Sequence, residues 1–264
     1  MLSKKKIYDV SKKNVIHSIV SFAKNRKDPN FQVLDHIMPK ERKIRSVVGG
    51  LETSLGTKLW EPLAKELASL NGFEVKDIKQ LEKPRRYSAE LRKAYTLILD
   101  DRENQRNGFT ASTSNLGIKK SCKLYTKKPV KIWEKPPKGR GIDVWLHKNN
   151  IDYIFDLKTV HPNVGSYNSF LKQILDWYCY YYSQWPTKKV EARIVFPYNP
   201  YIGDFWDMTI NKGNPLIKGK EAWVADEFWR FCTGTKGTYE IIIKAFKDIG
   251  KENLVSKELN KLFK

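Results

Sequence analysis

The sequence has few cysteines, no long apolar run and a shortage of acidic residues. Its three cysteines, Cys122, Cys179 and Cys232, are far apart and form no CxxC pair, so they suggest neither a zinc knuckle nor a disulfide framework. No apolar run approaches the roughly 20 residues that span a bilayer, and no apolar stretch follows the basic N-terminus as it would in a signal peptide. We therefore expect a soluble, cytoplasmic protein.

Basic residues dominate the charge of the chain. Lys and Arg number 49 against 29 Asp and Glu, which gives a formal net charge of +20. Such a protein is suited to bind a polyanion, namely DNA, RNA or anionic lipid. A basic surface that serves solubility alone is the alternative. The 264 residues and the 41% hydrophobic content allow a folded core, which argues against wholesale disorder.

The apolar spacing predicts helices at both ends of the chain and a mixed region between them. Helical spacing is present at 13–26, 51–70, 85–106, 167–185, 220–232 and 239–247. Pro62 either begins or kinks the second of these helices. Alternating apolar residues predict strands at 142–147, 151–159 and 190–196. The stretch 107–140 is rich in Gly, Ser, Thr, Pro and Lys, which is typical of loops and short strands.

One part of that stretch combines positive charge with aromatic rings. Residues 119–140 contain nine Lys or Arg and a single acid, Glu134, with Tyr125 and Trp133 between them. A solvated basic loop is one interpretation. Because nucleic-acid-binding segments mix cations with stacking rings, we favour a loop that follows a phosphate backbone.

The segment GIDVWLHKNNIDYIFDLKTV contains the residues with the clearest chemical meaning. Asp143 lies on the first strand of a predicted hairpin, and Asn149-Asn150 is typical of its turn. Asp156 and Lys158 lie two residues apart on the second strand, so they share a face. The hairpin can therefore place Asp143 beside them.

These three side chains have the chemistry that phosphodiester hydrolysis requires. Two carboxylates bind a hard cation such as Mg²⁺, which takes few protein ligands and lowers the pKa of a bound water. Lys158 would orient that water and offset charge on the phosphate, and the Leu157 carbonyl would add a metal ligand. The alternative is an ordinary strand with one polar face, since Asp-x-Lys also occurs by chance.

Asp-x12-Asp-x-Lys on a hairpin followed by a helix resembles the PD-(D/E)xK nuclease superfamily, although Ile142 stands where a proline is usual. The resemblance implies an α/β, restriction-endonuclease-like fold, with a mixed central β-sheet of about five strands flanked by helices on both sides. We accordingly expect residues 1–264 to form a single nuclease domain with helical N- and C-terminal parts. It also implies a helix-borne acid near the metal, for which Glu61 and Glu52 are rival candidates. The alternative for Glu61 is that it only complements the N-terminus of a helix beginning around Pro62.

Two segments resemble the TdeIII-like type II restriction endonucleases. They are RSVVGGLETSLGTKLWEPLAKELA at 45–68 and IDVWLHKNNIDYIFDLKTVHPNVGSY at 142–167. This resemblance implies sequence-specific cleavage of double-stranded DNA with one or two Mg²⁺ per active site, at a GGNCC-type site. It further implies a homodimer with one centre for each DNA strand, and a cognate DNA methyltransferase as genetic partner.

Candidate DNA contacts are basic residues near the hairpin and small polar residues of the first segment. They are Lys135, Lys138, Arg140, Arg85, Arg86, Thr53 and Ser54. Two other functions remain open at this point. One is a repair or recombination nuclease on the same scaffold, and the other is a basic DNA-binding protein without catalysis.

Overall fold

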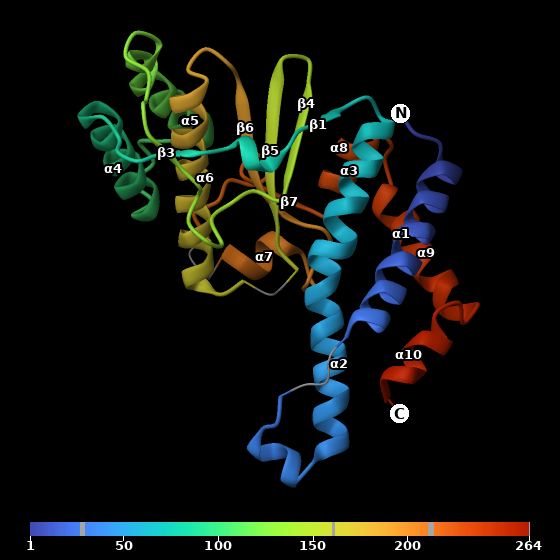
Figure 1. Ribbon diagram of the computed structural model, residues 1–264. Helices are drawn as coiled ribbons and strands as arrows, with labels where there is room; N and C mark the ends of the chain where they lie inside the picture. Colours follow the sequence, from blue (N-terminus) through green and yellow to red (C-terminus); the bar gives the residue numbers. More distant parts are fainter. Residues whose placement is uncertain (27–29, 160–161, 211–213, 264) are drawn as a thin grey trace. The chain divides into compact units, whose positions relative to one another are not determined.

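The computed structural model describes residues 1–26, 30–159, 162–210 and 214–263. The chain divides into two compact units, Met1–Asn71 with Phe228–Lys264, and Gly72–Glu227. Figure 1 shows their helices and strands. Across the described ranges, no helix combines the length and apolar character needed to cross a membrane.

The first unit is helical. Its elements are α1 (Lys4–Asn25), η1 (Val33–His36), α2 (Pro39–Leu55), η2 (Gly56–Trp60), α3 (Glu61–Leu70), α9 (Thr238–Lys251), α10 (Ser256–Phe263) and most of α8 (Asp226–Thr233). Helix α1 packs against α3, α9 and α10. The Trp60 ring lies 5.9 Å from that of Trp229 and 5.7 Å from that of Phe246, which joins the two ends of the chain in one core.

The helix expected at 51–70 begins earlier, at Pro39, and changes its winding in the middle. Residues 56–60 form a π-helical turn, and α3 follows with Pro62 in its first turn. Proline is tolerated there because a first-turn N–H has no partner within the helix. The deviation from regular winding therefore occurs just before Pro62, at the π-helical turn.

The second unit contains a mixed sheet of five strands, as expected. The strands are β1 (Glu74–Val75), β4 (Val144–Lys148), β5 (Ile151–Leu157), β6 (Val190–Phe196) and β7 (Ala222–Val224), in that spatial order. The β1–β4 and β4–β5 pairs are antiparallel, whereas the β5–β6 and β6–β7 pairs are parallel. Parallel strands need covering helices, which the sequence supplies between β5 and β6.

The predicted hairpin is present, and its turn has the expected chemistry. Asn149 and Asn150 adopt φ values of 53° and 59°. Two consecutive residues with positive φ make a type I′ turn, whose twist matches that of the flanking strands. The turn sets the register that pairs Lys148 with Ile151 and Val144 with Phe155.

Helix α6 (Val164–Gln184) covers one face of this sheet. Its buried side chains, among them Ile174 and Trp177, join the core with Ile154, Ala192 and Ile194 of the strands. Helices α4 (Ala89–Glu103) and α5 (Ala111–Ser121) pack on α6, beyond it from the sheet in Figure 1. The apolar side chains of α6 therefore belong to the core.

Two sequence expectations were wrong. The stretch 107–140 contains α5, which the many Ser and Thr residues concealed; Thr110 and Thr113 form a capping box, and Ile118 is buried. The stretch expected to be helical at 220–232 begins with strand β7, and α8 starts only after it. Strand β7 has only three residues, which are too few to show an alternating apolar pattern in the sequence.

The shorter elements are η3 (Ile78–Gln80), β2 (Lys83–Pro84), η4 (Lys123–Thr126), β3 (Trp133–Glu134) and α7 (Phe205–Ile210).

Candidate active site

Strands β4 and β5 bring Asp143, Asp156 and Lys158 together. Asp143 immediately precedes β4, and its N–H donates to the Phe155 carbonyl across the hairpin at 2.8 Å. Asp156 is the penultimate residue of β5. Lys158 directly follows the strand, and its N–H donates to the Val195 carbonyl of β6 at 2.8 Å. Neighbouring strands therefore fix the backbone of all three residues.

Short hydrogen bonds connect the side chains of this cluster. The Lys158 Nζ lies 2.6 Å from Asp156 Oδ2, which confirms that the two residues share a face of the sheet. The Leu157 N–H donates to Asp143 Oδ2 at 2.8 Å. The Asp143 carboxylate in turn lies beside that of Asp156. Two acids and one cation thus meet at one end of β5.

A fourth member, Gln173 of α6, was not among the residues predicted from sequence. Its Nε2 donates to Asp156 Oδ2 at 2.8 Å and to the Gly141 carbonyl at 3.2 Å. Gln173 is buried, and it orients the Asp156 carboxylate from the helix side. A signal for it existed, because Gln173 is a polar residue within the apolar stripe that includes Phe170, Ile174 and Trp177.

The environment of Asp156 opposes its ionisation. Burial raises the pKa of this carboxyl above its usual value, the adjacent Asp143 charge raises it further, and Lys158 lowers it only in part. Asp156 is 5% exposed. A carboxylate held beside a second one in a poorly solvated place has a deficit of positive charge, which a cation would correct.

The donor set fits a hard divalent cation. Among the described residues, no three His, Cys, Asp or Glu side chains gather as metal ligands. Two carboxylates are nevertheless the usual protein share for Mg²⁺, which keeps several waters and takes phosphate oxygens from the substrate. Asp143 and Asp156 would hold it, with the Leu157 carbonyl as the third candidate ligand. When bound, such an ion supplies Lewis-acid activation of a phosphate and of water.

Comparison with known families matches residues 3–250 to the family described as "Type II restriction endonuclease, HinfI". That range covers most of the chain, including the hairpin and α6. The chain belongs to the HinfI family of type II restriction endonucleases. Membership agrees with the mixed five-stranded sheet and its flanking helices.

A curated relative of this HinfI-family chain is the type II restriction enzyme MjaII of Methanocaldococcus jannaschii. The two are 27% identical over 124 residues, which are 44% of this chain and 34% of the relative. The matched part thus spans about a third of the length of that enzyme. No solved structure matches the chain.

Metal binding to this HinfI-family centre is expected to depend on pH. The pKa of Asp156 is raised in the folded state. The metal-free protein therefore loses stability as the pH rises above about 4, the usual carboxyl pKa, because Asp156 then acquires an unfavourable buried charge. A divalent cation relieves that charge but competes with protons. We therefore expect Mg²⁺ to raise the Tm at pH 8 by several degrees and at pH 5.5 by much less.

Thermal unfolding in EDTA and in Mg²⁺ at the two pH values measures this difference. Asp156→Asn should remove the Mg²⁺-dependent shift at pH 8, since the amide cannot replace the carboxylate charge. An equal Tm shift in the variant and the unsubstituted protein would place the metal elsewhere.

The rival acids Glu61 and Glu52 belong to the first unit, whereas the cluster belongs to the second. Glu61 begins α3, and its Oε2 lies 3.4 Å from Lys65 Nζ one turn later. Glu52 is exposed on α2. A role for either acid in the centre stays a prediction.

Two of the candidate DNA contacts, Arg85 and Arg86, line a hollow of about 510 Å³ in the second unit. Lys128 and Lys131 line it as well, and both come from the basic stretch that the sequence singled out. Arg85 also lies 3.6 Å from Glu134 while remaining largely exposed. The hollow therefore has a cationic rim suited to a phosphate backbone.

The remaining candidates differ in how freely their side chains can reach DNA. Lys135 and Lys138 are exposed. Arg140 donates to the Ser169 carbonyl of α6 at 3.0 Å, so part of its guanidinium is engaged in the fold. Thr53 donates to the Gly49 carbonyl within α2 at 2.9 Å, and Ser54 lines a small hollow of the first unit. Their contacts with DNA stay predictions.

Proposed function

We propose that this HinfI-family protein hydrolyses phosphodiester bonds of double-stranded DNA at a specific sequence, with Mg²⁺ bound by Asp143 and Asp156. The observation that carries the proposal is the pairing of these two carboxylates beside Lys158 at the end of β5. Lys158 positions the attacking water and offsets charge on the phosphate, while Gln173 holds Asp156. The Leu157 carbonyl adds a metal ligand.

The finer parts of the proposal concern specificity and assembly. We propose a TdeIII-like enzyme that reads a GGNCC-type site in the cytoplasm and whose host DNA is protected by a cognate methyltransferase. A site with twofold symmetry and one centre per chain favour a homodimer, in which each protomer cuts one strand. The single nuclease domain would then comprise both compact units, with Glu61 or Glu52 assisting the centre.

A digest of fully sequenced DNA in Mg²⁺, with the fragment ends mapped, tests this function. We expect discrete double-strand cuts that share one short sequence, and a GGNCC consensus supports the specificity that we propose. Nicking that follows DNA structure instead of sequence would indicate a repair or recombination nuclease. If DNA of varied sequence stays intact while the protein binds it, a non-catalytic DNA-binding protein remains.

A further inference from the structure

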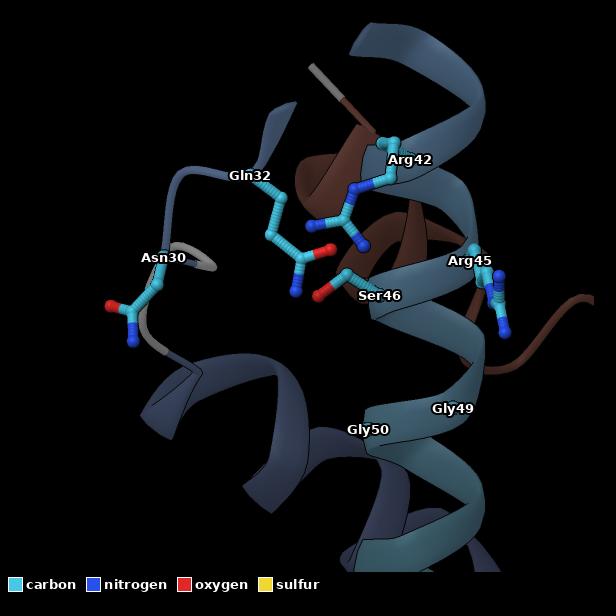
Figure 2. A pocket seen from close by; sticks show the side chains of 7 residues that line it. All are labelled: Asn30, Gln32, Arg42, Arg45, Ser46, Gly49 and Gly50. Carbon is cyan, nitrogen blue, oxygen red and sulfur yellow. The ribbon is translucent and has the colours of Figure 1, made fainter. Parts of the chain in front are cut away.

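A polar hollow of about 490 Å³ lies in the first unit, between Asn30 and Gln32, which precede η1, and the middle of α2. Figure 2 shows Arg42, Ser46 and Gln32 directed toward one another across it, and Arg45 of α2 lines the hollow as well. Among the described residues, no apolar side chain lines it. Its chemistry suits a small anionic group and not an apolar ligand.

Asp35 holds Arg42 in place at the edge of this hollow. Asp35 Oδ1 lies 3.3 Å from the Arg42 Nε, and its Oδ2 accepts from the Gln32 N–H at 2.6 Å. Asp35 thus contacts the guanidinium at Nε. Within the described part of the chain, the terminal nitrogens of Arg42 have no protein acceptor, and Figure 2 shows them directed into the hollow. A guanidinium fixed in this way offers its two-pronged edge to an anion.

A second guanidinium approaches from the end of α1. The Arg26 Nη2 donates to Ser46 Oγ at 2.7 Å. Gly50 makes this approach possible, because a Cβ at that position would lie only 2.7 Å from Arg26 Nη1. Ser46 accepts one hydrogen bond from Arg26, so its own hydroxyl proton can be donated into the hollow.

The polar residues continue in a row along α2 and the π-helical turn. Every fourth position is small or cationic: Arg42, Ser46, Gly50, Ser54 and Lys58. Successive members of this series are neighbours on the helix surface, and the row winds slowly around the helix. Ser54, Lys58 and Arg26 line a second hollow of about 370 Å³. The Arg26–Ser46 hydrogen bond links the two hollows, and we call the two hollows together the basic track.

We propose that this track binds phosphate groups of the DNA backbone, with Arg42 and Arg26 as the cations and Ser46 as a neutral donor. This inference rests on the proposed function, which supplies DNA as the ligand. It gives a role to Gly50 of the GGLETSLGT segment, which is small so that the Arg26 guanidinium can reach the phosphate. A phosphate contact fixes the register of the protein on the duplex but carries no sequence information.

The test is a fluorescence-anisotropy titration of the full chain against a labelled duplex in EDTA, repeated at several salt concentrations. Gly50→Ala is the informative variant, since alanine favours a helix over glycine and the added methyl displaces only the flexible end of Arg26. Gly250→Ala of α9 is its matched control, because a Cβ there meets nothing within 4 Å. Arg42→Ala and the exposed Arg230→Ala form a second matched pair.

We expect Arg42→Ala to weaken binding roughly tenfold, as the loss of a charge-assisted hydrogen bond does. The slope of log K against log salt should become shallower by about 0.9 for each phosphate lost. Gly50→Ala should weaken binding severalfold, equally for duplexes with and without the recognition site. Both control variants should bind as the unsubstituted protein does.

Titrations of Gly50→Ala and Arg42→Ala that superimpose on those of their controls would overturn the phosphate track. Far-UV circular dichroism checks that each variant is folded, and Gly50→Ala keeps the test decisive even if Arg42→Ala is not. The outcome is separable from that of the proposed function. If the unsubstituted protein cleaves DNA and both variants bind as it does, the track alone is refuted. If the unsubstituted protein leaves DNA intact and both variants bind more weakly, catalysis alone is refuted.

Discussion

Asp156→Asn will lower the rate of DNA cleavage by about 10³-fold or more and leave DNA affinity unchanged or slightly higher. The amide keeps the shape of the side chain but removes the charge that a divalent cation requires. Gln173 and Lys158 lose their common carboxylate partner at the same time. Affinity should not fall, because a negative charge near the scissile phosphate is lost and not gained.

Single-turnover cleavage of a plasmid, with affinity measured separately in EDTA, checks this expectation. Asp100→Asn is the matched control, since Asp100 is exposed on α4 and pairs with Arg106 at the surface. It should cut within about twofold of the unsubstituted protein, as surface ion pairs contribute little. An Asp156→Asn protein that cuts at the full rate would show that the centre lies elsewhere.

The second large effect concerns stability. Arg102→Met will lower the free energy of unfolding by about 3–5 kcal/mol, because it leaves Glu221 charged and buried without its partner. Arg102 and Glu221 are 5% and 0% exposed. Their two contacts, at 2.9 Å and 2.5 Å, form a bidentate pair between α4 and the residue before β7. Arg102 also donates to the Pro215 carbonyl at 2.9 Å.

Chemical denaturation followed by circular dichroism measures this loss, and Arg106→Met is the control. Arg106 pairs with Asp100 at 2.5 Å, but both side chains are more than half exposed, so its loss should cost less than about 1 kcal/mol. Replacing Arg102 and Glu221 together by methionine should recover much of the stability, since no buried charge then remains. Equal effects of the two single variants would contradict the role of burial.

The sequence allowed the centre of the sheet to be predicted because the signals there are local. The alternation around Asp143 and Asp156 and the two asparagines of the turn depend on neighbouring residues, and the structure contains that hairpin. The ion pair of Asp156 with Lys158 follows from a period of two. The helix after β5 was expected within three residues at its start and one at its end.

Elements stabilised by distant contacts could not be predicted in the same way. Helix α5 has a polar sequence, and its helical state depends on a capping box and on packing against α4 and α6. Strand β7 is held by parallel pairing with β6. Gln173 belongs to the site only through its hydrogen bond to Asp156, which lies 17 positions away in the sequence. Tertiary partners decide these features, and no local pattern specifies them.

The type I′ turn at Asn149-Asn150 has a consequence for how the hairpin can vary. The two acids are far apart along the chain, yet they meet because a loop of fixed length sets the pairing of β4 with β5. One inserted residue would shift the register and exchange the two faces of a strand. Asp143 would then be replaced beside Asp156 by the apolar Ile142 or Val144. The tip of this hairpin can therefore change its side chains over evolution, but insertions and deletions are tolerated only in pairs that keep both acids on one face.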